Sequence, residues 1–208
     1  MDFPVLAAEC APWVAPQTLE AIVRTESGFR PYAIGVNKGF RLIRQPVSRE
    51  EAIVTARWLI GNGYNIDLGL GQINSANLTR LGLSVEDAFD PCRNLAASAT
   101  ILGENYRSAR QQATDDQQAL RAALSAYNTG SFSRGFSNGY VQKVLSNAGA
   151  AAPAPVAPQI SQRSRQAVKP DSNPALPVAD AGYPPVYTIH VGENGTTVRD
   201  AQGVMVFE

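Results

Sequence analysis

Apolar residues near the start of the chain recur with the spacing of an amphipathic helix. After Pro16, which suits a first helical turn, Leu19, Ile22, Val23 and Glu26 occupy positions i, i+3, i+4 and i+7 of one helix face. Glu26 therefore extends an apolar stripe. Burial makes a lone carboxylate costly and raises its pKa, so the pattern makes Glu26 a candidate proton donor. The alternative is a surface glutamate at a fraying helix end.

The helical pattern continues as far as residue 147. Ser48-Arg49-Glu50-Glu51 is typical of a capping box, and Ala52, Ile53, Ala56, Leu59 and Ile60 are the expected inward positions of the helix that follows. Further helices are predicted at 74–81, from 84, at 94–112, at 116–127 and at 140–147. Residues 32–47 lack a helical period and predict a loop or a small hairpin. Residues 1–147 thus predict a mainly helical, compact domain.

The composition changes near residue 148. Residues 148–185 are rich in alanine and proline, which predicts an extended linker. Residues 186–208 predict a β-prone C-terminal tail, because 186–191 alternate and are β-branched, Asn194-Gly195 is a turn signal, and 204–207 could pair back. An isolated hairpin is marginally stable in water, so we expect the tail to order by adding a strand to a partner.

Charge and hydropathy narrow the classes of function. Lysines plus arginines equal aspartates plus glutamates, 18 of each, which gives no electrostatic case for binding nucleic acid or an anionic membrane. No apolar run is long enough to cross a bilayer, so an integral membrane protein is not expected. The N-terminus shows no basic region followed by a full apolar region, hence no ordinary signal peptide. Either the chain is exported by another route, or it is a mature or mis-started form.

The remaining metal-ligating residue types are few. The single histidine, His190, has no cluster of cysteine, aspartate or glutamate around it, so we predict a structural role and neither a metal site nor a cofactor. Cys10 and Cys92 form either a disulfide or two buried free thiols. A bond would close a long loop, could contribute about 4 kcal/mol in the chain-entropy model, and would imply an oxidising compartment.

Three downstream segments combine glycine, amides and tyrosine. Residues 69–74, with the sequence Gly-Leu-Gly-Gln-Ile-Asn, offer glycines that let the backbone approach a ligand and amides that suit sugar hydroxyls and acetamido groups. Residues 126–130, Ala-Tyr-Asn-Thr-Gly, end a helix, and Tyr140 opens another. Taken singly, these are a glycine-rich turn, a helix stop and a core tyrosine.

Taken together and in this order, the segments resemble the lytic transglycosylase family with a lysozyme-like domain. The resemblance covers about residues 9–147 and rests on Glu26-Ser27, the Gly-Leu-x-Gln segment at 69–72, the Ala-Tyr-Asn-x-Gly segment at 126–130 and Tyr140-Val141. It implies a mainly α, lysozyme-like α+β fold. Four further stretches resemble the transglycosylase component of type IV secretion systems: residues 10–12, 31–37, 45–48 and 89–95. Gly71 departs from the family pattern, where methionine is common, so a contact to substrate is altered.

The resemblance implies a substrate and a mechanism. The substrate would be the β-1,4 glycan of peptidoglycan, cut between N-acetylmuramic acid and N-acetylglucosamine with a 1,6-anhydro product. Glu26 would serve as general acid and then as base, with the substrate's own acetamido group stabilising the developing cation. Sugars would be held by Ser27, Gln72, Asn74, Tyr127, Asn128 and Tyr140. Asp67 is the one nearby acid that could be a second carboxylate.

The alternatives are a hydrolytic muramidase on the same fold and a non-catalytic glycan-binding scaffold of a secretion channel. The intact Glu26 within a complete motif set favours an enzyme over the scaffold. The expected partners are peptidoglycan glycan strands and, through the tail, components of a type IV secretion system. The expected location is the periplasm, although the signal peptide usual for that compartment is missing.

Overall fold

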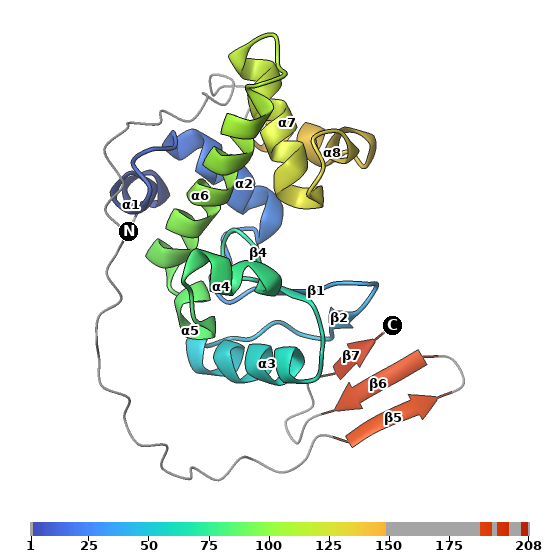
Figure 1. Ribbon diagram of the computed structural model, residues 1–208. Helices are drawn as coiled ribbons and strands as arrows, with labels where there is room; N and C mark the ends of the chain where they lie inside the picture. The colour runs from blue at the N-terminus through green and yellow to red at the C-terminus, as the bar shows by residue number, and fades with distance from the viewer. Residues whose placement is uncertain (1, 149–187, 193–194, 200–204, 208) are drawn as a thin grey trace. The chain divides into compact units, whose positions relative to one another are not determined.

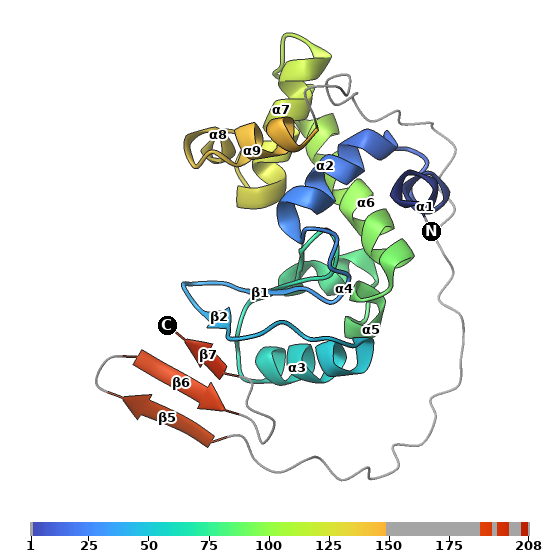
Figure 2. The same ribbon diagram turned by 180° about the vertical axis from the view of Figure 1, so that it is seen from behind.

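The computed structural model describes residues 2–148, 188–192, 195–199 and 205–207 (Figures 1 and 2). The chain divides into two compact units, one made of residues 1–38 and 45–160, the other of residues 39–44 and 161–208. Helices dominate the described part of the first unit, which confirms the mainly helical fold expected from the sequence. No helix among the described residues is long and apolar enough to span a membrane.

The helices begin and end close to the predicted positions. Those of the first unit are α1 (Phe3–Cys10), α2 (Pro16–Glu26), α3 (Arg49–Gly61), α4 (Leu78–Leu81), α5 (Val85–Ala88), α6 (Pro91–Ala109), α7 (Asp116–Thr129), α8 (Arg134–Ser137) and α9 (Tyr140–Asn147), with a 3₁₀ turn at Ser75–Asn77. The sequence did not predict α1 or α8. Helix α6 begins before residue 94, because Asp90 caps it by accepting from the Arg93 amide at 2.8 Å and Pro91 occupies its first turn.

The capping box expected at Ser48 forms only in part. The Ser48 hydroxyl accepts from the Glu51 amide, but the Glu51 carboxylate accepts from the Val47 amide at 2.8 Å. Ala52, Ala56 and Leu59 of α3 are buried, whereas Ile53 and Ile60 are only half-buried. A complete capping box forms instead at Ser84, where α5 begins.

The core of the first unit lies between five helices. Helix α6 packs against α7 and α1, and α2 packs against α1 and α9 (Figure 2). Leu19 and Ile22 of α2, Leu102 of α6, Leu120 of α7 and Val144 of α9 are almost fully buried in one apolar cluster. The stripe predicted on α2 therefore points into the core, and Glu26 at its end is directed toward the edge of that core.

A small antiparallel sheet completes the first unit. Strand β3 (Ile66–Leu68) pairs with β1 (Ile34–Val36) on one side and with β4 (Ile73–Asn74) on the other. The register sets Asp67 between Gly35 and Asn74. The hairpin considered for residues 32–47 does not form, because β1 pairs with β3, where the buried Ile34 and Leu68 lie opposite each other.

The second unit is a four-stranded antiparallel sheet in the order β2-β7-β6-β5. Its strands are β2 (Arg41–Leu42), β5 (Thr188–Gly192), β6 (Gly195–Arg199) and β7 (Met205–Phe207). The tail therefore contains strands, and β7, within the segment expected to pair back, pairs with β6 of the tail and also with β2. The linker predicted at 148–185 lies outside the described residues apart from Ala148, and the domain boundaries remain predictions.

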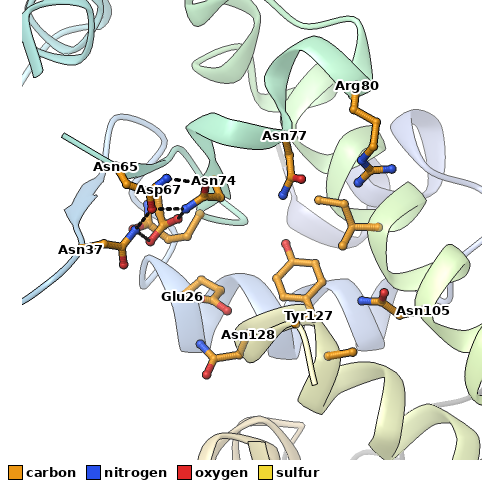
Figure 3. A pocket seen from close by; sticks show the side chains of 14 residues that line it. Glu26, Asn37, Asn65, Asp67, Asn74, Asn77, Arg80, Asn105, Tyr127 and Asn128 are labelled. Carbon is orange, nitrogen blue, oxygen red and sulfur yellow. Dashed lines mark hydrogen bonds between the residues drawn. The ribbon is translucent and has the colours of Figure 1, made fainter. Parts of the chain in front are cut away.

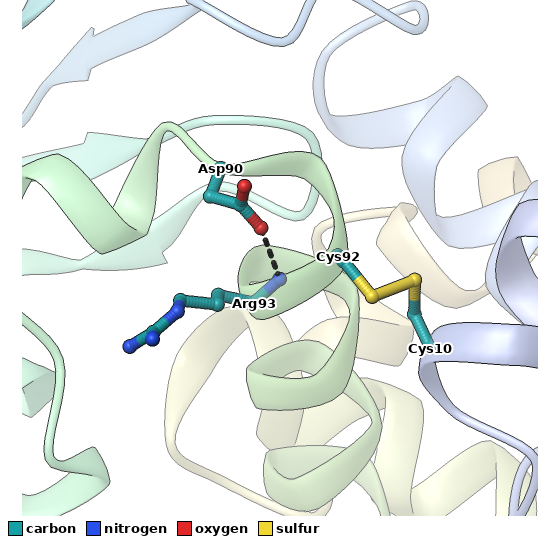
Figure 4. Close-up of a disulfide and its surroundings, with 4 residues drawn as sticks. All are labelled: Cys10, Asp90, Cys92 and Arg93. Atoms are coloured by element: carbon teal, nitrogen blue, oxygen red, sulfur yellow. Dashed lines mark hydrogen bonds between the residues drawn. A yellow bond between two sulfur atoms is a disulfide. The ribbon is translucent and has the colours of Figure 1, made fainter. Parts of the chain in front are cut away.

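A disulfide joins Cys10, at the end of α1, to Cys92, in the first turn of α6 (Figure 4). The two residues are 82 positions apart in the sequence. Cys10 packs in an apolar cluster with Val23, Leu70 and Leu95. The bond thus ties α1 to α6, the helix that carries Ile101 and Asn105.

Candidate active site

Glu26 opens onto a polar cavity of about 440 Å³ (Figure 3). A volume of this size falls within the range of about 300–1,000 Å³ that is usual for ligand sites. The lining is rich in side-chain amides and comes from α2, the small sheet, α4, α6 and the end of α7. It consists of Glu26, Asn37, Asn65, Asp67, Gln72, Asn74, Asn77, Arg80, Ile101, Asn105, Ala126, Tyr127, Asn128 and Gly130.

The last residue of α2, Glu26, has an unusually basic carboxyl group. Its pKa is raised to about 7, chiefly by burial and also by the negative charge of Asp67, although a hydrogen bond from Tyr140 has a lowering effect. The Tyr140 hydroxyl donates that bond to Glu26 Oε1 at 2.5 Å. Burial raises the pKa of Tyr140 well above its ordinary value, so this hydroxyl keeps its proton at neutral pH. Glu26 can therefore both hold and release a proton near pH 7.

Asp67 lies in the centre of an amide cluster on the sheet. Its Oδ1 accepts from Asn74 Nδ2 at 2.7 Å, and its Oδ2 accepts from Asn37 Nδ2 at 2.9 Å. Asn65 links the two donors, because its Oδ1 accepts from both of them at 2.8 Å. Burial raises the pKa of Asp67 although these amide bonds oppose the rise. The strand register brings the cluster together, and both carboxylate oxygens already have donors.

The Gly69–Gln72 segment is held by α6 and α7. Asn94, which is almost fully buried, donates to the Leu68 and Ala88 carbonyls and accepts from the Gly71 amide at 2.8 Å. The Tyr127 hydroxyl donates to the Gly71 carbonyl at 2.7 Å. A β-carbon at position 71 would come within 1.9 Å of the Ser98 hydroxyl and 2.9 Å of the Tyr127 hydroxyl, so a larger residue here would require these side chains to move.

Gln72 and Asn128 are held in place by their neighbours. Gln72 Nε2 donates to the carbonyls of Gly69 and Ala33, and its backbone has a positive φ of 49°. At the end of α7, where Gly130 adopts the left-handed conformation, Asn128 Oδ1 accepts from Asn138 Nδ2 at 3.1 Å. Gln72 Nε2 therefore points to protein carbonyls, and the Nδ2 of Asn128 is the group left for a ligand acceptor.

The structure brings most of the predicted site residues to one cavity. Glu26, Gln72, Asn74, Tyr127 and Asn128 line it. Tyr140 does not line it but contacts Glu26 directly. Ser27 is also outside the lining: its side chain is almost fully buried and its hydroxyl donates to the Val23 carbonyl at 3.2 Å. Ser27 thus contributes to the end of α2 and offers no hydroxyl to the cavity.

Sequence reasoning missed several lining residues: Asn37, Asn65, Asn77, Arg80, Ile101 and Asn105. A signal was present on α6, where Asn94, Ser98, Ile101 and Asn105 occupy positions i, i+4, i+7 and i+11. That stripe faces the cavity side of the helix. No comparable local signal joins Asn37 to Asp67, since only the pairing of β1 with β3 makes them neighbours. Among the described residues, no group of three or more His, Cys, Asp or Glu could hold a metal ion.

Comparison with known families agrees with this geometry. The sequence model of the family described as Transglycosylase SLT domain matches residues 3–148, which is more than half of the chain. The chain belongs to the transglycosylase SLT domain family.

The curated relatives that the chain matches carry the name virB1. The chain is 51% identical over 154 residues to "Type IV secretion system protein virB1" of Brucella abortus, an alignment that covers 71% of this chain and 64% of that protein. It is 44% identical over 144 residues to "Protein virB1" of Agrobacterium fabrum, covering 69% of this chain and 58% of that protein. The aligned part thus spans less than two thirds of the length of these relatives. No solved structure matches the chain.

Proposed function

We propose that this chain is a lytic transglycosylase that cleaves the β-1,4 bond between N-acetylmuramic acid and N-acetylglucosamine in peptidoglycan. The observation that carries the proposal is Glu26, a buried carboxyl group with a pKa of about 7 that faces an amide-lined cavity. A pKa near the working pH is the property that general acid–base catalysis requires. Membership of the transglycosylase SLT domain family supports the same reaction class.

In the first step, the protonated Glu26 donates its proton to the glycosidic oxygen. The bond between C1 of the muramyl unit and that oxygen breaks, and the N-acetylglucosamine side leaves as an alcohol. The acetamido group of the muramyl unit stabilises the positive charge that develops at C1, as in substrate-assisted glycosidases. Asp67 is not needed as a nucleophile, and both of its oxygens are already engaged by amides.

In the second step, ionised Glu26 takes the proton from the muramyl 6-hydroxyl. The oxygen of that hydroxyl bonds to C1 and closes the 1,6-anhydro ring, so that Glu26 returns to its protonated form without a water molecule. Tyr140, the neighbour of Glu26, stabilises the ionised form between the two steps through its hydrogen bond. Gln72, Asn74, Tyr127 and Asn128 line the space where the sugars are positioned, and Asn128 Nδ2 is the amide donor left for them, because the amide groups of Gln72 and Asn74 already donate to the protein.

The biological setting is proposed from the relatives. Relatives named "Type IV secretion system protein virB1" are 51% identical to this chain over 154 residues, so we propose that the chain opens the cell wall locally in the periplasm for such a system. The tail is the proposed contact with the secretion machinery. Of the described strands, β5 pairs only with β6, so its other edge is the place where a partner could add a strand.

Product analysis tests the proposed reaction. Purified protein is incubated with peptidoglycan, and the released muropeptides are analysed by mass. Muropeptides that end in a 1,6-anhydro ring, each lighter by one water than a reducing end, support the transglycosylase. Reducing ends would instead identify a hydrolytic muramidase. If no muropeptides are released, the remaining alternative is a non-catalytic glycan-binding scaffold.

Replacing Tyr140 with phenylalanine is expected to shift the pH dependence of cleavage. The Tyr140 hydrogen bond lowers the pKa of Glu26, so its loss raises that pKa above about 7. The general acid must be protonated, and activity is lost as pH rises through its pKa. We therefore expect the basic limb of the kcat/KM profile to move to higher pH. A basic limb that stays in place or moves to lower pH would contradict the assignment. Tyr106→Phe, which removes the hydroxyl of another tyrosine in the core, is the control that should leave the limb in place.

A chain that ends at Asn147 is expected to keep its fold and its cleavage activity. All the residues that line the cavity, and Tyr140 beside it, precede that point. Muropeptide release and thermal unfolding of the shortened chain measure the two properties. Loss of release in a folded protein would show that the predicted boundary is wrong. Unchanged secretion in cells that carry the shortened chain would mean that the tail is an inert end.

A further inference from the structure

The cavity has a second group of hydrogen-bond donors that the proposed cleavage does not use. Figure 3 shows Arg80 and Asn105 on the opposite side of Tyr127 from Asp67, with Asn77 above Tyr127 in this view. Arg80 is the only cation among the residues that line the cavity, whereas Glu26 and Asp67 are its acids. The two ends of the cavity therefore differ in charge, which favours a ligand with a neutral part at one end and an anionic part at the other.

Asn105, near Arg80 in the cavity lining, carries a buried hydrogen-bond donor that has no acceptor. Its Nδ2 is fully buried and has no hydrogen-bond partner, and it is the one such side-chain atom among the described residues. A buried amide that lacks a partner destabilises the protein, so such groups are rare unless they serve a purpose. Asn105 lines the cavity, and a rotation of its side chain would present this donor to an acceptor oxygen on a bound ligand.

Arg80 provides a positive charge at this end of the cavity, where its side chain is exposed. Its Nη1 pairs with Glu104 at 2.6 Å, in an ion pair that is exposed on both sides. The guanidinium has five N–H donors in a planar fork that matches a carboxylate, so one ion pair leaves donors for a ligand. Asn77, from the turn before α4, adds a third side chain with an amide donor.

We propose that the Arg80 end, defined as Asn77, Arg80 and Asn105, binds a carboxylate carried by the substituent at O3 of the muramyl unit. This inference rests on the proposed function, because it takes the peptidoglycan glycan as the ligand. The sugar rings and acetamido groups of that glycan are neutral, and the O3 substituent is its anionic part. The carboxylate has two sources, the peptide stem or, where the stem has been removed, the lactyl group itself.

Binding to three glycans tests the proposal and separates the sources. Arg80→Gln is compared with its parent in a Glu26→Gln background, which prevents turnover. The ligands are stem-bearing glycan fragments, the same fragments stripped of peptide by an amidase, and chitotetraose, which has no O3 substituent. We expect Arg80→Gln to weaken binding of at least one muramyl ligand by about 10- to 100-fold and to leave chitotetraose unchanged. Arg110→Gln, which breaks the exposed Arg110–Asp116 pair, is the matched control.

The pattern of losses decides the outcome. Weaker binding of the stem-bearing glycan alone assigns the carboxylate to the peptide, and weaker binding of the stripped glycan alone assigns it to the lactyl group. An equal loss on chitotetraose, or no loss on any ligand, overturns the proposal. If the unsubstituted protein fails to cleave peptidoglycan, the proposed function fails, while these affinities still report on the Arg80 end.

Asn105 offers a second test with an unusual combination of signs. Asn105→Leu keeps the approximate size of the side chain and removes the unpartnered donor. We expect the unfolding temperature of the free protein to rise by about 2 °C or more, while binding of the muramyl ligand becomes weaker. A residue with only a structural role would lose stability instead. Lower stability with unchanged binding would therefore remove Asn105 from the site.

Discussion

Replacing Glu26 with glutamine is expected to lower peptidoglycan cleavage by at least ~10²–10⁴-fold, the usual contribution of general acid–base catalysis. Glutamine keeps the shape of the side chain and can still accept the Tyr140 hydrogen bond through its carbonyl oxygen. It has no proton to give to the glycosidic oxygen and cannot take one from the 6-hydroxyl. Release of anhydro-muropeptides over time, measured by mass, checks the expected loss.

Two comparisons make this result specific. Glu20→Gln changes a glutamate on the same helix that pairs with Arg24 outside the cavity, and it should leave the rate unchanged. The Glu26→Gln protein should be at least as stable as its parent at pH 8. In the parent, Glu26 ionises near its ordinary pKa of 4.5 when the chain is unfolded but only near about 7 when it is folded, so stability falls as pH rises between these values and that loss is complete at pH 8. Near-native cleavage by a folded Glu26→Gln protein would remove Glu26 as the acid.

Loss of the Cys10–Cys92 bond is expected to give the largest change in stability. For residues 82 positions apart, the chain-entropy relation predicts that about 4.5 kcal/mol of unfolding free energy depends on the bond. That is a large part of the roughly 5–15 kcal/mol that stabilises a typical domain. Denaturant unfolding of the oxidised protein, of the reduced protein and of a Cys10→Ala, Cys92→Ala variant measures it.

The three samples separate the bond from the packing around it. The reduced protein keeps both side chains in their apolar cluster, so its difference from the oxidised protein reports the bond alone. The double-alanine variant also loses packing, and its stability should not respond to reductant. Equal stability of the oxidised and reduced proteins would show that the bond does not stabilise the fold. Two free thiols in unfolded protein isolated without reductant would show that the bond is absent.

The helices and the candidate acid were predictable because their signals are local. An apolar stripe at i, i+3, i+4 and i+7 sets Leu19, Ile22 and Val23 on one face and carries Glu26 to the end of it. Caps such as Ser84 and left-handed glycines such as Gly130 also act within one turn of a helix. Helix α1 was missed because its eight residues carry no amphipathic pattern, and the disulfide and the packing against α2 and α6 hold it in place.

The carboxylate–amide cluster could not be predicted because its members meet through strand pairing. The cluster draws on three strands and their ends, through Asn37, Asn65, Asp67 and Asn74. The sequence pattern around Asn37 predicted only a loop or a local hairpin. A short strand chooses its partner by burial on a shared face, here Ile34 opposite Leu68, and that choice depends on the helices that cover the sheet.

The sequence by itself determined the helical character of residues 1–147, the position of Glu26 at the end of an apolar face, and the family. Only the tertiary structure decided what surrounds that carboxyl group: Tyr140, 114 residues away, and the charge of Asp67. It also places the Ser27 hydroxyl against the Val23 carbonyl, outside the cavity lining, and it places Arg80 and Asn105 in that lining. The physical reason is that helix periodicity and caps depend on neighbours within a turn, whereas desolvation, pKa and a shared cavity depend on packing between distant segments.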